Sequence, residues 1–208
     1  MSDIQTGITV AGSGSAESVP DLMHVDIGVS VRSETVSEAS RQARDHATAL
    51  IDALTASGVE RSDVATRTYS VHPEYDHRDG EQRLLGYRVD NELSVTIREV
   101  SAAGSILDAA VSAAEDFVTI NRVQLAVADE SAARDQAREA AWGDALARAE
   151  HLAGLAGRSL GPVLSIVEST GQSPGPRPMM RTAMAESTPI QAGTATTNVT
   201  LEVRFSLD

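Results

Sequence analysis

Residues 129–168 read DESAARDQAREAAWGDALARAEHLAGLAGRSLGPVLSIVE, and this stretch decides the fold. Its first residues predict a helix start, because Asp129 and Ser131 offer capping oxygens and acidic side chains suit the positive end of a helix. Apolar side chains then recur at three- and four-residue steps, which places them on one helical face: Trp142, Ala145, Ala149, Leu152 and Ala156. We therefore expect a helix that buries this face.

The second half of the stretch predicts a stop and a strand. Gly157 is expected to end the helix in a left-handed conformation, and Pro162 prevents a restart. The run from Val163 to Val167 has the β-branched density of a strand. This helix, its end and the strand describe the fold, and they do not by themselves indicate a catalytic activity.

Composition excludes several classes of function. The chain has 208 residues and a net charge of −13, so nucleic acid and anionic membranes are unfavourable partners. It has no cysteine, which excludes disulfides, thiolate catalysis and Cys-ligated zinc. All 17 basic residues are arginine, so Schiff-base chemistry on lysine is excluded too.

The N-terminus and the hydropathy pattern bear on location. Residues 1–7 have no basic start and no apolar run of signal-peptide length. No stretch reaches the 18 or so consecutive apolar residues that a spanning helix needs, so no membrane insertion is expected. As given, the chain is expected to be cytoplasmic, unless an export signal was removed before the numbering begins.

Alternating and helical periodicities place the other elements. In chain order we expect strands at 8–10, 23–31, 64–71, 87–97, 123–127 and 199–207, and helices at 36–54 and 103–117, the first opened by the capping box Thr35-x-x-Glu38. The order is β-β-α-β-β-α-β-α-β-β. Met23 to Val127 follows the β-α-β-β-α-β order of a ferredoxin-like unit. Clean alternation favours sheets with one exposed face, so the predicted class is α+β, mainly antiparallel, with three helices.

Three segments are expected between or within these elements. Gly12-Ser13-Gly14 lacks a following helix, so we expect a bulge or strand end there and not a phosphate loop. Residues 72–83 are polar and predict a hairpin loop, and residues 171–189 predict a flexible loop. The chain is expected to form a single domain over 1–208, with two packed lobes, about 1–100 and 101–208, as the alternative.

Four motifs in this order and spacing resemble the SIMPL-domain family. They are Ile8-Thr9-Val10-x-Gly12-x-Gly14 with Pro20-Asp21, Thr66-x-x-Tyr69-x-Val71-x-Pro73-x-Tyr75 with Gly86-Tyr87, the stretch 129–168 with Leu160-Gly161-Pro162, and Thr188-Pro189-Ile190 leading through Gly193 to the alternation from Val199 to Leu207. Together they cover almost the whole chain. The resemblance implies proteins that are often exported, some of them ring- or channel-like homo-oligomers, others linked to oxidative-stress tolerance or protein partners. It carries over no catalytic residue.

Polar clusters supply only weak candidates for chemistry. His72, Glu74, Asp76 and His77 have metal-ligand side chains, but extended backbone turns His77 to the opposite face, so a solvated hairpin tip is the preferred interpretation. Metal analysis of protein purified without an affinity tag tests this. His24 and Asp26 could pair at i, i+2, but no nucleophile is identifiable beside them. We predict no catalytic residue, no metal and no cofactor.

Candidate contact residues lie elsewhere. Trp142 is expected in the core, with an interface anchor as the alternative, and Asn91 interrupts an apolar strand face. A disordered loop is the preferred interpretation of the segment 171–189. The alternative is a partner surface, because the segment combines stiff prolines with adaptable methionines: Pro176, Arg177, Met179, Met180 and Arg181.

Three functions follow. The first is a non-enzymatic, self-associating protein that acts in stress defence or protein assembly. The second is a monomeric module that binds a peptide or protein through a sheet edge or the 171–189 loop. The third is a metal-dependent enzyme that uses the cluster at 72–77.

Overall fold

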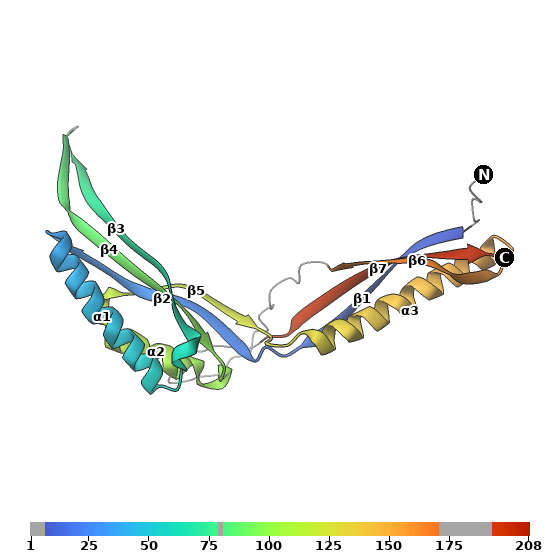
Figure 1. Ribbon diagram of the computed structural model, residues 1–208, viewed down its shortest axis with the longest axis horizontal. Coiled ribbons are helices and arrows are strands. Elements are labelled where there is room, and N and C mark those ends of the chain that lie inside the picture. Colours follow the sequence, from blue (N-terminus) through green and yellow to red (C-terminus); the bar gives the residue numbers. More distant parts are fainter. Residues whose placement is uncertain (1–6, 79–80, 171–192) are drawn as a thin grey trace. The chain divides into compact units, whose positions relative to one another are not determined.

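The computed structural model describes residues 7–78, 81–170 and 193–208 (Figure 1). In chain order the elements are β1 (Gly7–Ser18), β2 (Leu22–Ser33), α1 (Val36–Ala56), β3 (Val64–Arg78), β4 (Glu81–Ile97), α2 (Ala103–Ala114), β5 (Val118–Ala126), α3 (Ser131–Leu155), β6 (Leu160–Thr170) and β7 (Ala195–Leu207). The predicted α+β class and the order β-β-α-β-β-α-β-α-β-β are confirmed.

The described residues form two compact units. Unit 1 contains 7–20, 127–170 and 193–208, and unit 2 contains 21–78 and 81–126. The helix α2 and the strand β5, which both follow residue 100, belong to unit 2. In the sequence, residues 21–126 of unit 2 lie between β1 and α3 of unit 1, so unit 1 is built from segments on both sides of unit 2.

Unit 2 is built on a four-stranded antiparallel sheet in the order β3-β4-β2-β5. Both of its helices, α1 and α2, lie on one face of this sheet (Figure 1). This arrangement confirms the ferredoxin-like β-α-β-β-α-β unit. Directly opposed residues in an antiparallel pair point to the same face, so the ladder from Met23↔Ile97 to Val31↔Val89 sets one apolar face against the helices. The core contains Met23, Val25, Ile27, Val29, Val31, Leu50, Leu54, Val89, Leu93, Val95 and Ile97.

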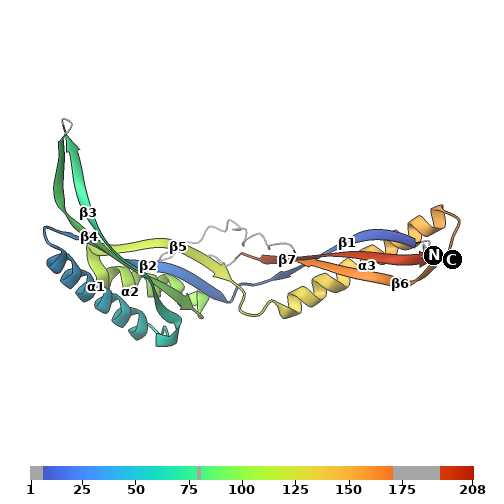
Figure 2. The same ribbon diagram turned by 45° about the horizontal axis from the view of Figure 1, so that its top comes forward.

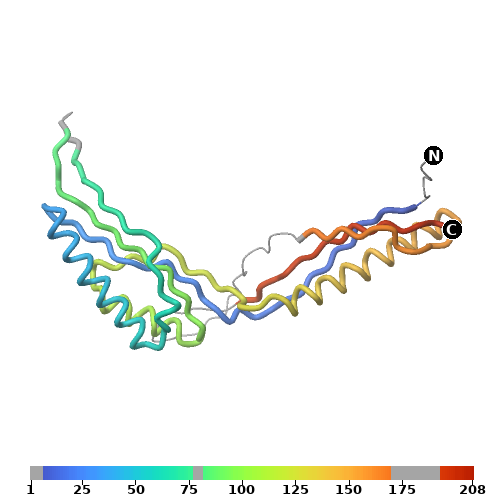
Figure 3. The backbone as a smooth tube through the Cα atoms, viewed as in Figure 1, coloured from blue at the N-terminus to red at the C-terminus, as the bar shows by residue number. Residues whose placement is uncertain are grey.

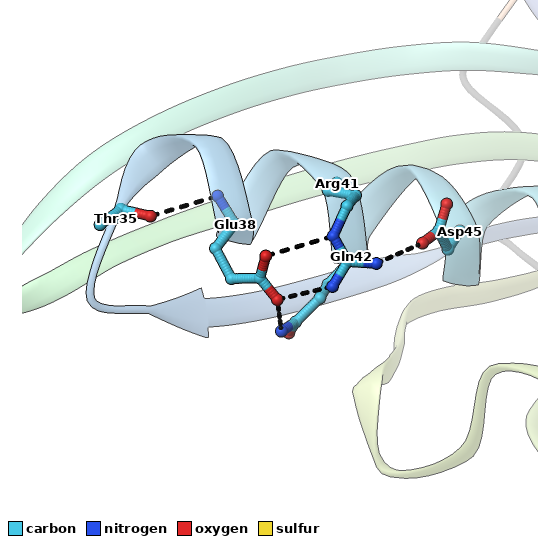
Figure 4. Close-up of polar contacts among 5 residues, drawn as sticks. All are labelled: Thr35, Glu38, Arg41, Gln42 and Asp45. Carbon is cyan, nitrogen blue, oxygen red and sulfur yellow. Dashed lines mark hydrogen bonds and ion pairs between the residues drawn. The ribbon is translucent and has the colours of Figure 1, made fainter.

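The capping box at the start of α1 is half formed (Figure 4). Thr35 has extended backbone, and its hydroxyl accepts a hydrogen bond from the Glu38 N–H at 3.3 Å. The Glu38 carboxylate does not return to Thr35; it accepts hydrogen bonds from Arg41 and Gln42, at 2.7 and 2.6 Å. The hydrogen bond from Arg41 is the main cause of the lowered pKa of Glu38, and the bond from Gln42 adds to it. Thr35 thus fixes the helix start, and Glu38 supports the first turns.

The hairpin between β3 and β4 is longer than the sequence predicts. The expected loop over residues 72–83 is instead strand on both sides, because the ladder continues through His72↔Arg88 and Asp76↔Arg83. A bulge follows Glu74, opposite Gly86, which has φ +150°. A Cβ at that glycine would lie 2.5 Å from the Ser33 carbonyl oxygen, so the bend favours glycine.

Unit 1 is built on a three-stranded antiparallel sheet in the order β1-β7-β6. The two ends of the chain pair along their whole length, from Gly7↔Ser206 to Ser18↔Ala195, and run side by side as the blue and red strands of Figure 3. The helix α3 runs along the same sheet (Figure 2) and packs chiefly against β1 and β7. The face beneath α3 contains Val10, Ala16, Val199, Leu201, Val203 and Phe205.

The close packing of α3 on β1 corrects the predicted helix face. The buried side chains recur every four residues: Ala133, Ala137, Ala141, Ala145, Ala149 and Ala153. Of the expected face, Trp142 is half-buried, Leu152 is 43% exposed and Ala156 is exposed. The reason lies in β1, where Gly12 and Gly14 leave room for methyl groups but not for larger side chains. These glycines lie inside a continuous 12-residue strand, so the expected bulge or strand end is absent there.

The ends of α3 agree with the sequence in part. Gly157 has φ +68°, the predicted left-handed stop. The N-cap position is Glu130, which makes no side-chain cap. The Asp129 carboxylate accepts a hydrogen bond from the Ser131 N–H at 2.8 Å, and hydrogen bonds from Ser131 lower the pKa of Asp129.

Candidate functional site

The face of the unit 2 sheet that points away from the helices is a network of polar side chains. Alternation along the strands places there His24, Asp26, Ser30 and Arg32 from β2 and Arg88, Asp90, Glu92, Ser94 and Thr96 from β4. Ser30 donates a hydrogen bond to Asp90 at 2.6 Å, and the Asn121 amide donates one to Glu92 at 2.7 Å. The network therefore links β5 to β4 across β2, and its acids are used in cross-strand contacts.

Asp26 is the buried acid of this network, 8% exposed. A bulge in β3 at Arg67 lets that guanidinium reach across to form an ion pair with Asp26. The hydrogen bond to Asp26 is the main cause of the raised pKa of Arg67, and Glu92 adds to it. His24 does not pair with Asp26, because its ring Nδ1 lies 3.2 Å from the Thr96 hydroxyl. The structure thus separates the histidine and the acid that sequence spacing could join.

The metal-ligand candidates lie on β3. Glu74 forms ion pairs with Arg32, at 3.1 Å, and with Arg88. His72 is exposed opposite Arg88, and Asp76 stands opposite Arg83. The side chain of His77 lies outside the described residues. Within the described side chains no group of three or more His, Asp or Glu could hold a metal ion. A metal ion at Glu74 would have to displace Arg32 and Arg88 from its carboxylate.

The candidate partner residues cannot be placed. Pro176, Arg177, Met179, Met180 and Arg181 lie outside the described residues. Asn91, by contrast, lies on the helix-facing side of β4 opposite Val29. Its side-chain oxygen is buried and finds no hydrogen-bond partner among the described residues. This position costs stability, and it points into unit 2 and not toward a ligand.

A cavity of about 410 Å³ opens in unit 2 between the end of α1, the end of β4 and the start of α2. It is lined by Ser57, Gly58, Val59, Glu60, Asp63, Thr96, Ile97, Arg98, Glu99, Ala102 and Ile106. Arg98 donates two hydrogen bonds to the Asp63 carboxylate, at 2.7 and 2.8 Å. Because these two charges satisfy each other, their main role is to tie the turn before β3 to the end of β4.

This ion pair predicts an acid-dependent loss of stability. The Arg98 hydrogen bond lowers the pKa of Asp63 from its usual 3.8. Between the lowered folded pKa and the unfolded one, the unfolded state binds more protons, so stability is present above about pH 4 and is lost as pH falls through that window. We expect urea midpoints measured from pH 6 to pH 2 to fall more steeply for the wild type than for Asp63→Asn. Parallel pH profiles of the urea midpoint for the two proteins would contradict this. The matched control is Asp45→Asn, because the Asp45 side chain is 59% exposed.

The two edges of the unit 1 sheet differ. At β1, the Ser13 N–H donates to the Asp144 carboxylate at 2.9 Å, and Arg148 donates to the Ala11 carbonyl at 3.0 Å. The bond from Ser13 is the main cause of the lowered pKa of Asp144. These two α3 side chains therefore satisfy two backbone groups in the middle of this edge. A strand edge covered in this way is protected from pairing with another chain.

At the opposite edge, β6, no side chain among the described residues is seen to cover the strand in this way. Val163, Ile166 and Val167 are 40%, 54% and 55% exposed. Ile166 stands opposite buried Val203, so it points to the α3 side, whereas Val167 stands opposite Glu202 and points away. This edge exposes apolar side chains on both of its faces.

Comparison with known proteins gives the family. The model of the family SIMPL, described as a protein of unknown function (DUF541), matches residues 8–205, from the first strand to the last. The chain belongs to the SIMPL family. This confirms the resemblance that the four motifs indicate.

The relatives of this SIMPL chain cover most of its length. It is 32% identical over 185 residues to "Uncharacterized protein YggE" of Escherichia coli K12, which is 89% of this chain and 74% of that protein. It is 31% identical over 216 residues to the "26 kDa periplasmic immunogenic protein" of Brucella melitensis, 96% of this chain and 84% of that protein. The second name says periplasmic of that relative and gives no support to the cytoplasmic expectation. Among the described helices of the SIMPL chain, none is long and apolar enough to cross a membrane.

The exposure of β6 in the SIMPL chain was not predicted from the sequence. The β-branched density from Val163 to Val167 predicts a strand but does not show which of its side chains are exposed. The alanines of α3 could have indicated it. A helix that packs closely on β1 through alanines does not extend over β6, which is two strands away in the sheet.

Proposed function

We propose that this SIMPL protein is a non-catalytic protein that associates with further copies of itself, in stress defence or protein assembly. The observation that carries the proposal is the uncovered edge β6 of unit 1. The stress-defence part follows from the family resemblance. We assign it no catalytic residue, because the polar side chains described above are engaged in strand-to-strand contacts.

Contrast between the edges supports self-association. The edge β1 is closed by Asp144 and Arg148, and natural sheets are protected at edges that must not pair. The edge β6 has no such cover among the residues that the structure describes, and it exposes Ile166 and Val167. Between Ser159 and Thr170 the chain has a single charge, Glu168, in a protein of net charge −13. Copies that repel each other elsewhere can meet at such a neutral stretch.

Size-exclusion chromatography with light scattering tests the proposal. Between roughly 1 and 200 μM, the range expected of a small interface, the mass should rise above that of the 21.9 kDa monomer. Salt at 0.5 M should favour the larger species over 0.05 M, because it screens the repulsion between acidic chains. A strict monomer under all these conditions refutes the proposal.

A monomer would favour a second function, a module that binds a peptide at the edge strand β3. α1 packs against β2 and β4, and β3 lies beyond them at the edge of the sheet. Tyr69, Val71 and Tyr75 are 53%, 38% and 46% exposed there. An extended peptide can add a strand to such an edge and place side chains beside these residues.

A further inference from the structure

We infer that the polar face of the unit 2 sheet binds a phosphate group, either as inorganic phosphate or as part of a small phosphorylated molecule. The site consists of His72 of β3, Arg88 of β4 and Arg32 of β2, and we call it the arginine row. It lies within unit 2, so it is independent of any association through β6. The inference adds a ligand to the proposed function.

The strand register places the three side chains in one line across the sheet. Arg88 stands directly opposite Arg32 on one side and opposite His72 on the other, because β4 lies between β2 and β3. Directly opposed residues share a face of the sheet, and their Cβ atoms are about 5 Å apart. Two arginines in such a pair repel each other, which destabilises the sheet unless an anion neutralises them.

One carboxylate neutralises both arginines in part. Glu74 forms ion pairs with Arg32, at 3.1 Å, and with Arg88. Two guanidiniums and one carboxylate leave an excess of one positive charge, in a protein of net charge −13. In other ion pairs of the described residues each arginine has at least one acid of its own: Arg41, Arg67, Arg98, Arg134, Arg138 and Arg148. The arginine row is therefore a locally basic site.

The two arginines keep N–H donors for a ligand. The ion pair of Arg32 uses its Nε, and that of Arg88 uses its Nε and one Nη. Among the described residues, no other acceptor forms a hydrogen bond or ion pair with either guanidinium. The arginine side chains are 48% and 47% exposed, whereas that of Glu74 is 21% exposed. Glu74 thus holds two accessible guanidiniums in place, which lowers the entropy cost of binding.

The donors of the row suit phosphate better than carboxylate. A guanidinium presents a planar fork of N–H donors that matches the oxygens of either anion. A phosphate group has three strong acceptor oxygens that point in different directions, and it carries up to two negative charges. It can therefore accept from Arg32, Arg88 and His72 together, whereas a carboxylate has only two oxygens in one plane.

The charge of the whole chain favours a small soluble ligand. The next acid along this face of β4, Asp90, accepts a hydrogen bond from Ser30 at 2.6 Å. Acids farther away act weakly on a small ion at the row, because salt screens exposed charges beyond about 8 Å at physiological ionic strength. An anionic membrane, by contrast, presents an extended surface that a chain of charge −13 meets with repulsion.

Isothermal titration calorimetry of the full chain with inorganic phosphate, at neutral pH and low salt, tests the inference. We expect one phosphate per chain with a dissociation constant on the order of 1 mM, as for a few exposed contacts. Arg32→Met and Arg88→Met keep an apolar stem but remove the charged fork, so each should weaken binding roughly tenfold. Circular dichroism confirms that each variant is folded. In the wild type, NMR signals of the Arg32 and Arg88 Nε–H groups should shift on titration.

Arg122→Met is the matched control. Arg122 is an exposed arginine of β5, opposite Asp26 and so on the same face of the same sheet. The substitution changes the net charge of the chain by the same amount as the two variants in the row. It should leave phosphate binding as in the wild type.

Four outcomes would overturn the inference. The first is no phosphate binding by the wild type, and the second is an NMR response that leaves Arg32 and Arg88 unchanged. The third is an equal loss of binding in Arg122→Met, which would mean that phosphate follows net charge. Free glycerol phosphate should bind as inorganic phosphate does. The fourth is retention on phosphatidylcholine vesicles that contain phosphatidic acid, without binding of glycerol phosphate, which would assign the row to a lipid headgroup.

Discussion

Gly12→Ala is expected to lower the free energy of unfolding by about 3 kcal/mol, although it adds one methyl group. The new Cβ would lie 2.5 Å from the Ala145 nitrogen and 2.6 Å from the Ala145 Cβ, and closer still to the Ala141 carbonyl oxygen. Two of these three atoms belong to the backbone of α3, which cannot rotate away as a side chain can. The helix must therefore lift from β1 and loosen the contacts of its alanine stripe.

Gly143→Ala is the matched control in α3 itself. A Cβ at Gly143 meets no atom within 4 Å, so the same substitution costs no packing there. It should raise the free energy of unfolding by roughly 0.5–1 kcal/mol, because alanine is the better helix former. Urea denaturation followed by Trp142 fluorescence and by circular dichroism measures both variants. Equal effects of the two substitutions would mean that α3 does not pack on β1 at the described distance.

Leu50→Ala is expected to cost roughly 2–5 kcal/mol, the range for a buried leucine truncated to alanine. Leu50 is 0% exposed, in the part of α1 that packs on the unit 2 sheet. The loss combines the removed apolar surface with the cavity that remains in a closely packed core.

Leu155→Ala is the matched control, because it makes the same substitution at an exposed position. The substitution is identical, but Leu155 is 73% exposed at the last residue of α3. Its effect should stay within about 0.5 kcal/mol, as for other surface positions. Chemical denaturation monitored by circular dichroism at 222 nm compares the pair. A cost below 1 kcal/mol or so at Leu50 would contradict the described core of unit 2.

Periodicity predicts most of the fold because the inner strands β2, β4 and β7 each have one buried face. The alternation around Val25 and Val95 gives strands, the capping residue Thr35 gives a helix start, and their order gives the ferredoxin-like unit. Pairing between the chain ends cannot be derived in this way. Nothing local in β1 or β7 shows that Gly7 stands opposite Ser206, since that register depends on contacts almost 200 residues apart.

The buried face of α3 shows how local rules fail. A tryptophan in a helix is expected to point inward, as the largest apolar side chain. Here Gly12 and Gly14 on the facing strand leave room only for methyl groups of α3. The alanines of α3 therefore face the sheet, and Trp142 lies at the side of this contact. Sequence periodicity assigns residues to faces but does not give the distances between elements, so it could not predict this exchange.

The pairing of β1 with β7 also sets an order in time for synthesis. The described residues of unit 2, 21–78 and 81–126, are all present in the nascent chain long before β7 is made. The sheet of unit 1 has β7 at its centre, so β1 and β6 must wait for the last residues before they can pair. While it waits on the ribosome, β1 exposes an apolar face and two glycines without their partner helix. Chaperone contact during translation is therefore expected to concentrate on β1 and to end when β7 emerges.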